Sequence, residues 1–287
     1  MQDFIDRAPD TMSKAKYSAM RERSVGVGVM GFASYLQKKM IPFDSPEARE
    51  LNIKIFKDLK EKADDASRRL AKIKGACPDA IEANIEERFT HKLAIAPTAS
   101  ISIIAGNCSP GIEPYIANAF TQKTLAGSMA IKNKFLKETL ARHNMDTETV
   151  WSNIVVNNGS VQHLSFLTQH EKDVFRNAYE INQKAIIELA ADRTPYICQA
   201  QSLNLFLYAN IYKKELHDLH FLAWKLGVKS LYYCRSLSIQ RAETVSHNEK
   251  IRMDFDDDLK NKKEKSDSES MQNNEMICTD DICTSCQ

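Results

Sequence analysis

The sequence lacks the signals of a membrane, a secreted or a nucleic-acid-binding protein. It contains no apolar run near the roughly 20 residues that cross a bilayer, and its first residues lack the basic-then-apolar order of a signal peptide. Lys and Arg number 39 against 38 Asp and Glu, whereas proteins that grip duplex nucleic acid by its phosphates carry a basic excess. We therefore expect a cytoplasmic protein that contacts neither membrane nor nucleic acid.

The sequence also lacks the features of repeat, fibrous and disulfide-stabilised proteins. The chain has no repeat of fixed period, and its 43% hydrophobic and 27% charged residues exclude a collagen-like or wholly disordered protein. Cytoplasmic thiols stay reduced, so we do not expect the seven cysteines to form a disulfide framework. More than half of residues 248–270 are charged, which predicts a globular body over 1–246 and a flexible tail over 247–287.

Helix boundaries are readable in the globular body. A serine–proline pair starts a helix over 46–74 that closes at Gly75. Thr168 opens a capping-box pattern, and helical spacing of apolar residues continues from there to Leu189. A third helix ends at Gly227.

Short strands are expected between the helices, over 24–29, 92–96 and 229–233. Each is bounded by glycine, proline or polar residues. Alternating helices and strands predict an α/β protein with largely parallel strands, which an open sheet and a barrel both satisfy.

The glycines of Gly26-Val-Gly28-Val-Met-Gly31 match a dinucleotide-binding pattern. That pattern needs an apolar strand before it, whereas residues 14–23 are rich in charge. We favour a glycine-rich buried strand packed closely against its neighbours. Dinucleotide binding is the alternative.

The segment from Pro97 to Ser102 lies where a predicted strand gives way to a turn. Its small residues let backbone N–H groups point at an anion, and the Thr98 and Ser100 hydroxyls add donors. An ordinary Ser/Thr-rich capping turn would have the same pattern. Spacing alone leaves phosphate binding and a capping turn as equal alternatives.

Three cysteines, Cys278, Cys283 and Cys286, crowd into the end of the chain. Closely spaced thiols beyond a flexible tether suit disulfide exchange, because a thiolate needs freedom to approach its target. Zinc is the rival, but no histidine follows His247 to complete a four-ligand site. We favour redox exchange over zinc and over incidental cysteines.

Other residues carry no functional signal by pattern alone. Tyr232 and Tyr233 are adjacent, and neighbours on a strand face opposite sides, so one would be core and the other surface. The histidines have no metal-ligand spacing, and the remaining cysteines are expected to be small buried groups. These histidines and cysteines are His91, His163, His217, His220, Cys77, Cys108, Cys198 and Cys234.

Taken together, several of these segments resemble one family. The Pro-Thr-Ala-Ser-Ile turn at 97–101, the Gly-Asn-Cys-Ser-Pro-Gly-Ile-Glu-Pro-Tyr segment at 106–115, the adjacent tyrosines and the terminal cysteines occur there in this order. The matching glycine-rich and Gln-Ala-Gln-Ser-Leu-Asn segments lie at 26–32 and 199–204. The chain resembles the C-terminal part of the large (α, catalytic) subunit of class I ribonucleoside-diphosphate reductase over nearly its whole length.

The resemblance implies a fold and a substrate site. The fold is a ten-stranded α/β barrel, of which this chain would form the C-terminal part. Pro97, Thr98, Ala99, Ser100 and Ile101 would hold the diphosphate of a ribonucleoside diphosphate substrate. The implied reaction reduces ribonucleoside diphosphates to deoxyribonucleoside diphosphates for DNA synthesis.

The resemblance also implies a radical relay and a redox tail. Tyr232 and Tyr233 would pass a radical from the small β subunit to the active site. Cys283 and Cys286 would re-reduce the active-site disulfide and would themselves be reduced by thioredoxin or glutaredoxin, with Cys278 leaving the pairing open. We expect no metal or cofactor on this chain and a di-metal tyrosyl radical in the β subunit.

One family element is missing from the sequence. The radical cysteine of the family lies in an Asn-x-Cys-x-Glu motif, and no cysteine here has glutamate two residues later. The substrate-reducing cysteines and the nucleotide-effector sites also belong to the preceding half of the family's subunit. Because Met1 stands just downstream of that half, we expect a split subunit whose N-terminal half is a separate partner. The alternative is a non-catalytic remnant that binds partners without turnover.

Overall fold

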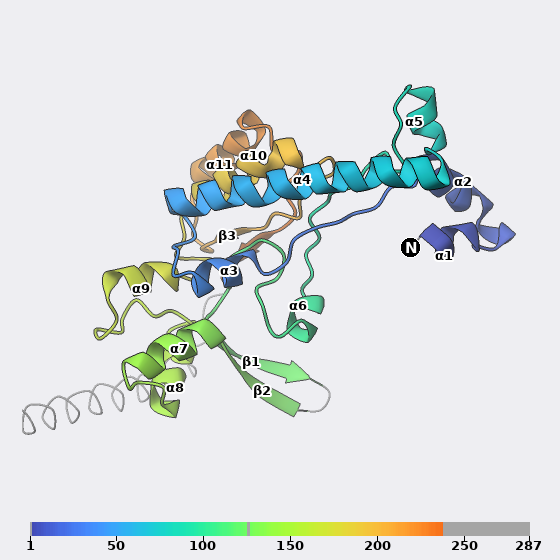
Figure 1. Ribbon diagram of the computed structural model, residues 1–287. Helices are drawn as coiled ribbons and strands as arrows, with labels where there is room; N and C mark the ends of the chain where they lie inside the picture. The colour runs from blue at the N-terminus through green and yellow to red at the C-terminus, as the bar shows by residue number, and fades with distance from the viewer. Residues whose placement is uncertain (1, 125–126, 238–287) are drawn as a thin grey trace, which may run out of the picture.

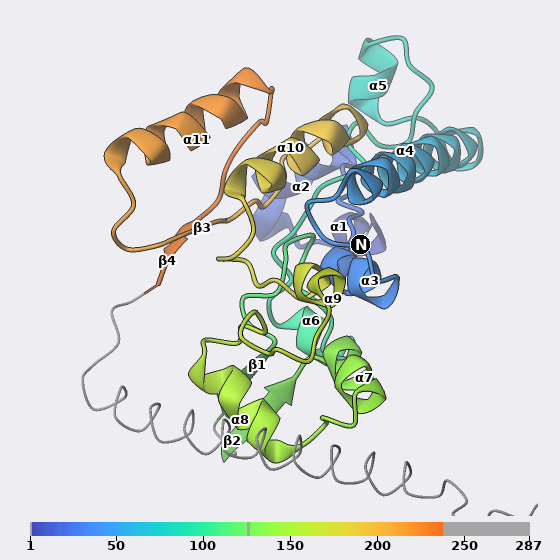
Figure 2. The same ribbon diagram turned by 90° about the vertical axis from the view of Figure 1, so that its left-hand side faces the viewer.

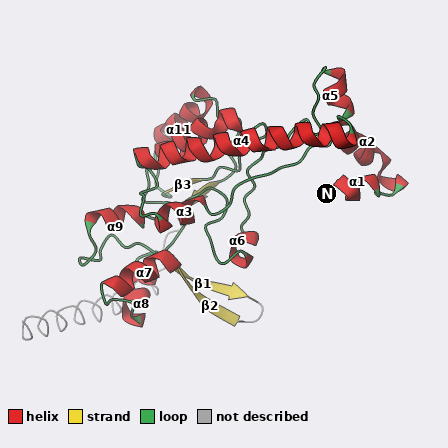
Figure 3. Cartoon of the chain, in the orientation of Figure 1, coloured by secondary structure: helices red, strands yellow, loops and turns green. Residues whose placement is uncertain are grey.

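The computed structural model describes residues 2–124 and 127–237 of the 287-residue chain (Figure 1). The tail predicted over 247–287, with its three cysteines, lies outside the described residues, so both stay predictions. Helices and loops make up most of the described chain, and the strands are short (Figure 3).

The elements are α1 (Gln2–Asp6), η1 (Asp10–Met12), α2 (Ser13–Glu22), α3 (Phe32–Lys38), α4 (Pro46–Lys74), α5 (Pro78–Glu82), α6 (Ile101–Ile104), β1 (Ala119–Thr124), β2 (Gly127–Lys132), α7 (Lys134–Arg142), α8 (Glu148–Val156), α9 (Gln169–Val174), α10 (Gln183–Arg193), η2 (Thr194–Tyr196), β3 (Leu205–Leu207), α11 (Lys213–Lys225) and β4 (Cys234–Ser236).

Four extended segments lie side by side and run parallel. Val27 pairs with Leu93, and Ile95 pairs with Gln201, each through an isolated parallel bridge. β3 pairs with β4, again in parallel. We call this array the four-segment sheet, and its segments in order are residues 25–29, 92–96, 199–207 and 232–237.

The expected strands agree with this sheet in direction, and the last one is misplaced. The first two pair in parallel as predicted, although only through single bridges. Pairing of the last begins at Tyr232, whose N–H donates to the Leu203 carbonyl at 2.8 Å, and β4 follows the predicted range 229–233. In the predicted range, the Lys229 ammonium donates to the Cys198 carbonyl at 2.7 Å.

α4, α10 and α11 lie on one side of the four-segment sheet (Figures 1 and 2). Apolar side chains from these helices and from the sheet meet in the main core, and removing that surface from water is the dominant favourable term in folding. Members of this core include Phe56, Ile186, Leu189, Ile95, Leu203 and Phe206.

A buried arginine ties two helices to the sheet. Arg193, the last residue of α10, is 1% exposed. Its Nε donates to Oε1 of Gln201 at 2.6 Å, and its Nη1 donates to Oδ1 of Asn52 on α4 at 3.0 Å. Burial lowers the pKa of Arg193 to about 9. The contact fixes the sheet segment that carries residues 199–204.

A second body lies on the opposite side of the sheet from α4 (Figures 1 and 2). β1 and β2 form an antiparallel hairpin, which the sequence did not predict, and α7, α8 and α9 surround a separate core. That core contains Leu136, Leu140, Ile154, Leu164 and Phe175.

Helix-capping signals in the sequence are confirmed. The Ser45 hydroxyl accepts from the Ala48 N–H at 3.1 Å at the start of α4, and Gly75 ends that helix with a φ of +83°. The Thr168 capping box is present in full at α9. α11 is followed by Gly227 with a φ of +76°.

The long helix predicted from Thr168 to Leu189 is wrong, because the chain forms two helices there. α9 ends at Val174, and Asn182 caps the separate helix α10. Between them the Ala178 N–H donates to the Tyr115 carbonyl at 2.8 Å. This contact with a distant segment takes the backbone out of helical hydrogen bonding, which local periodicity does not reveal.

The glycine-rich segment is an edge of the sheet. A Cβ on Gly28 would lie 2.4 Å from the Ala94 carbonyl oxygen, so only glycine fits, and the predicted close packing is confirmed. The predicted burial is wrong, because Gly26, Val27 and Gly28 are exposed. The glycines lie within the extended segment, whereas a dinucleotide site needs them after a strand.

Burial of the cysteines differs from expectation. Cys77 is buried as predicted, Cys108 is half-buried, and the prediction is wrong for Cys198 and Cys234, which are exposed. Cys198 directly precedes the third segment of the sheet, and Cys234 is the first residue of β4, all of whose residues are exposed. Within the described ranges, no helix combines the length and apolar character that crossing a membrane requires.

Candidate active site

The loop at residues 97–101 leaves the second segment of the sheet and enters α6. Thr98 has a left-handed φ of +50°, which is uncommon for a β-branched residue. Its carbonyl accepts from the Ser102 N–H at 2.9 Å, and its Oγ1 accepts from the Gly111 N–H at 2.8 Å. Pro97, Ala99, Ser100 and Ile101 are exposed. Hydrogen bonds to Thr98 therefore hold the loop, and its other residues are open to solvent.

A glycine makes this support possible. Gly111 has a φ of +51°, and a Cβ there would lie 3.2 Å from the Ala96 carbonyl oxygen. The first amides of a helical turn have no partner within the helix, so the N–H groups at the start of α6 can bond outside it. Amides and hydroxyls gathered without bulk are suited to hold an anion.

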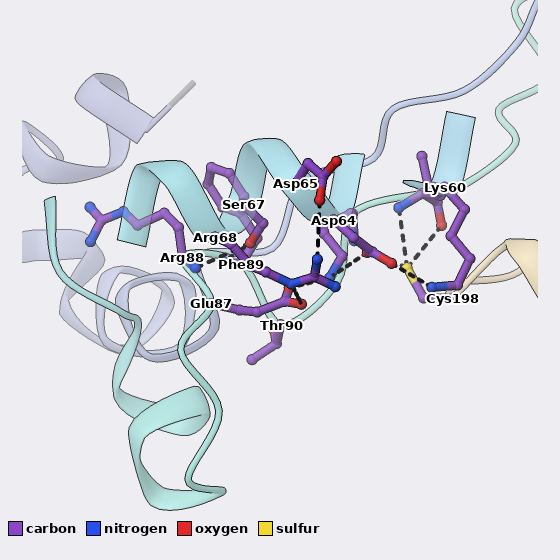
Figure 4. Close-up of polar contacts among 12 residues, drawn as sticks. Lys60, Asp64, Asp65, Ser67, Arg68, Glu87, Arg88, Phe89, Thr90 and Cys198 are labelled. Carbon is purple, nitrogen blue, oxygen red and sulfur yellow. Dashed lines mark hydrogen bonds and ion pairs between the residues drawn. The ribbon is translucent and has the colours of Figure 1, made fainter. Parts of the chain in front are cut away.

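An ion cluster fixes the segment from which the loop departs (Figure 4). Lys60 and Asp64 pair one turn apart on α4, and the Lys92 ammonium lies 2.9 Å from Asp64 and also pairs with Glu87. Burial opposes ionisation of Asp64, but hydrogen bonds from Lys60 and Lys92 outweigh it and lower the pKa of Asp64. The cluster ties α4 to the second sheet segment.

The rings of Tyr232 and Tyr233 are in contact at the last segment of the sheet. Their centroids are 4.1 Å apart with an interplanar angle of 54°, and each residue is about half exposed. The neighbouring Tyr233 phenol raises the pKa of Tyr232. The Arg235 guanidinium lies 5.3 Å from the centroid of the Tyr233 ring. Strand alternation alone predicts opposite faces, and the irregular backbone before β4 allows the contact instead.

A buried carboxylate lies directly behind this tyrosine pair. Glu113 is 8% exposed and Asn204 is 4% exposed. The Asn204 backbone N–H donates to Oε1 of Glu113 at 2.7 Å, and its Nδ2 donates to Oε2 at 3.0 Å. Oδ1 of Asn204 accepts from the Tyr233 N–H at 3.1 Å. Burial raises the pKa of Glu113, although Asn204, Arg235 and Arg193 oppose the shift.

The sequence did not identify this pair as functional. Glu113 and Asn204 belong to segments 106–115 and 199–204, which the sequence singled out, but their partnership spans 91 positions. A glutamate in an otherwise uncharged segment is the signal that could have found it, because a buried carboxylate needs hydrogen-bond donors.

The glycine-rich segment joins the same assembly. The Gly31 N–H donates to the carbonyls of Ser109 and Gly111 at 3.0 and 2.9 Å. Ser34 on α3 hydrogen-bonds to the Tyr115 hydroxyl at 2.7 Å. Segments 26–32, 97–101, 106–115 and 199–204 and the tyrosine pair thus meet in one place. Cys283 and Cys286, the remaining predicted site residues, lie outside the described residues.

No metal site is evident in this region. Within residues 2–124 and 127–237, no group of three or more His, Cys, Asp or Glu side chains is placed to hold a metal ion. The described site instead offers backbone amides, hydroxyls and phenols. These groups can hold an anion and can exchange protons and electrons.

Known proteins share this chain's sequence and fold. The profile of the ribonucleotide reductase barrel domain matches residues 1–88 and 79–234. The chain is 50% identical over 252 residues to the ribonucleoside-diphosphate reductase large subunit of Invertebrate iridescent virus 6, covering 86% of this chain and 26% of that protein. It is 43% identical over 250 residues to the large subunit of Invertebrate iridescent virus 3, covering 86% of this chain and 39% of that protein.

A solved structure gives the same result. The α subunit of the class Id ribonucleotide reductase of Actinobacillus ureae superposes with a TM-score of 0.76 at 39% identity, covering 83% of this chain and 44% of that one. The chain spans less than half the length of each of these three proteins.

Proposed function

The chain belongs to the ribonucleotide reductase family through its barrel domain, and we propose that it takes part in reducing ribonucleoside diphosphates to deoxyribonucleoside diphosphates. The expected α/β barrel fold is confirmed by the family profile and the structural neighbour. The described residues form an open part of that barrel. One observation carries the functional proposal: hydrogen bonds connect the 97–101 loop, the 106–115 segment and the tyrosine pair.

In this proposal the 97–101 loop holds the substrate diphosphate. The Thr98 and Ser100 hydroxyls and the amides at the start of α6 donate to phosphate oxygens. The bond from Gly111 to Thr98 supports this assignment, because it occupies an acceptor site of the hydroxyl and leaves its proton free to donate to the ligand. The loop binds without a lysine or arginine of its own, so shape and donor placement set its affinity.

Tyr232 and Tyr233 act in this proposal as the relay for an oxidising equivalent. Each phenol passes on an electron together with its hydroxyl proton. Ring contact supports this role, because it gives the electron a short path between the two side chains. The radical cofactor of a small β subunit would supply the oxidising equivalent.

Turnover requires groups that the sequence lacks. We propose that a segment with the family's radical cysteine motif completes the barrel. Cys283 and Cys286 then re-reduce the active-site disulfide, and thioredoxin or glutaredoxin reduces Cys283 and Cys286. Exposed backbone at residues 26–28 and at β4, the outer segments of the four-segment sheet, supports further strand pairing there. Cytoplasmic location stays a prediction.

The experiment that tests this proposal replaces each relay tyrosine by phenylalanine. The full chain is combined with the family's radical-cysteine segment and β subunit, and deoxynucleotide formation is measured. Tyr232→Phe and Tyr233→Phe should abolish turnover and leave diphosphate binding unchanged, because only the hydroxyl is lost. Tyr17→Phe, at an exposed tyrosine on α2, is the matched control. Near-wild-type turnover in either relay variant would refute the relay, whereas no turnover by the wild-type complex would favour a non-catalytic remnant.

A further inference from the structure

Resting on the proposed function, we propose that Glu113 is a positioning residue for the relay: its carboxylate clamps Asn204, and Asn204 holds the backbone of Tyr233. Glu113 touches neither tyrosine hydroxyl. It acts through Asn204, which receives the Tyr233 N–H on Oδ1. We call Glu113 and Asn204 the clamp.

Each polar side-chain atom of the clamp has a hydrogen-bond partner. A carboxylate has only acceptors, and it receives both the backbone N–H and the side-chain amide of Asn204. Holding Nδ2 against Glu113 forces Oδ1 to face the opposite way, toward Tyr233. Both residues are buried, so water does not replace a lost partner cheaply, and a mismatch costs the full desolvation of the orphaned group.

The tyrosine pair needs such a clamp because packing holds it weakly. Both rings are about half exposed, so the backbone has to set their position. The Tyr233 carbonyl accepts from the Leu205 N–H at 2.9 Å, and its N–H donates to Asn204 at 3.1 Å. The peptide groups on both sides of Tyr233 are thereby held by consecutive residues, 204 and 205.

The clamp lies close in sequence, through Glu113, to the residue that supports the substrate loop. Glu113 lies two residues after Gly111, whose N–H holds the Thr98 hydroxyl. One short segment therefore fixes the loop through its glycine and the tyrosine pair through its glutamate.

The test exchanges the acid and the amide between the two clamp positions. Glu113→Gln sets the new glutamine Nε2 against the Asn204 Nδ2, two donors facing each other. Asn204→Asp sets two carboxylates together. The double variant Glu113→Gln/Asn204→Asp restores every bond. Its new glutamine accepts from the backbone N–H of residue 204 and donates to the new aspartate, which still accepts from the Tyr233 N–H.

The readout is radical transfer, measured apart from folding and binding. In the reconstituted complex, 3-aminotyrosine at position 233 traps the radical, and electron paramagnetic resonance measures its yield. Each single variant should lower the yield by about tenfold or more, and the double variant should recover most of it. Diphosphate affinity should stay within about twofold of wild type in all three. Asn118→Asp, at a buried asparagine outside the clamp that donates to Gly159 and Phe175, is the control for general destabilisation.

Each outcome decides the proposal. Unchanged radical yield in folded single variants, or a double variant no better than the singles, would overturn the clamp. If the single variants do not fold, Asn204→Ala takes their place, and a wild-type yield in that variant would also overturn it. Absence of any radical in the wild-type complex would instead contradict the proposed function, so the two failures are distinguishable.

Discussion

The N–H of Gly111 donates to the hydroxyl of Thr98 at 2.8 Å, across thirteen positions of sequence. The hydroxyl therefore cannot rotate freely, and its proton points away from Gly111. A threonine in a left-handed conformation is uncommon, so the bond explains why this residue stays in that conformation. The candidate phosphate donor is fixed before any ligand arrives.

Replacing Thr98 by valine should weaken diphosphate binding by about tenfold, because it removes a donor to the ligand and leaves the Gly111 N–H without its acceptor. Thr98→Ser keeps the hydroxyl and should bind nearly as wild type. Affinity for a ribonucleoside diphosphate, measured by calorimetry on the reconstituted complex, compares the two variants. Equal affinity in Thr98→Val and wild type would mean that the segment is only a capping turn.

Local signals in the sequence predicted the helix ends correctly. The caps at Ser45 and Thr168 depend on residues within one turn of each other, so short patterns carry them. The break between α9 and α10 depends on the Tyr115 carbonyl, which lies far away in the sequence. Tertiary hydrogen bonds of this kind override helical periodicity, and local patterns in a single sequence do not predict them.

Replacing Cys283 and Cys286 by serine should leave the first turnover intact. Thiols of the completing segment start reduced and need no shuttle for one cycle, whereas later cycles driven by thioredoxin or glutaredoxin should fail. Dithiothreitol should partly restore them because it is small enough to diffuse into the barrel. Single- and multiple-turnover assays separate the two phases. Sustained thioredoxin-driven turnover in the double variant would eliminate this pair and direct attention to Cys278.

Asp64 should make the stability of the chain pH-dependent in a defined direction. Its pKa is lowered in the folded chain, where burial is outweighed by Lys60 and Lys92, and Glu87 shares the Lys92 ammonium. A carboxyl group whose pKa is lowered by folding stabilises the folded chain at pH values above its pKa in the unfolded chain. That stabilisation is lost as the pH falls through its pKa in the folded chain. Asp64→Asn should cost about 2 kcal/mol at neutral pH and progressively less below pH of about 4.

Denaturant unfolding of both chains across this pH range measures the difference. A cost that stays constant from neutral to acidic pH would contradict the ion cluster. Lys62→Gln, which removes an exposed pair with Asp58 on the same helix, is the control and should change stability by less than about 0.5 kcal/mol.

The site was predictable in its segments and not in its geometry. Motif order placed the loop and the tyrosine pair in one family, whereas the clamp needed the structure, because Glu113 lies in a loop and Asn204 in a sheet segment, 91 positions apart. The tyrosine contact was also beyond pattern, since strand alternation predicts that Tyr232 and Tyr233 diverge. Local patterns in the sequence predicted the segments, and contacts between distant segments required the structure.

The most direct measurement is deoxynucleotide formation by the full chain in three mixtures: with the β subunit alone, with the radical-cysteine segment alone, and with both. We predict product only in the complete mixture, because in the proposed function this chain supplies the diphosphate loop and the relay, and its sequence has no cysteine in the radical motif. No product in the complete mixture, or robust product from this chain and the β subunit alone, would contradict it.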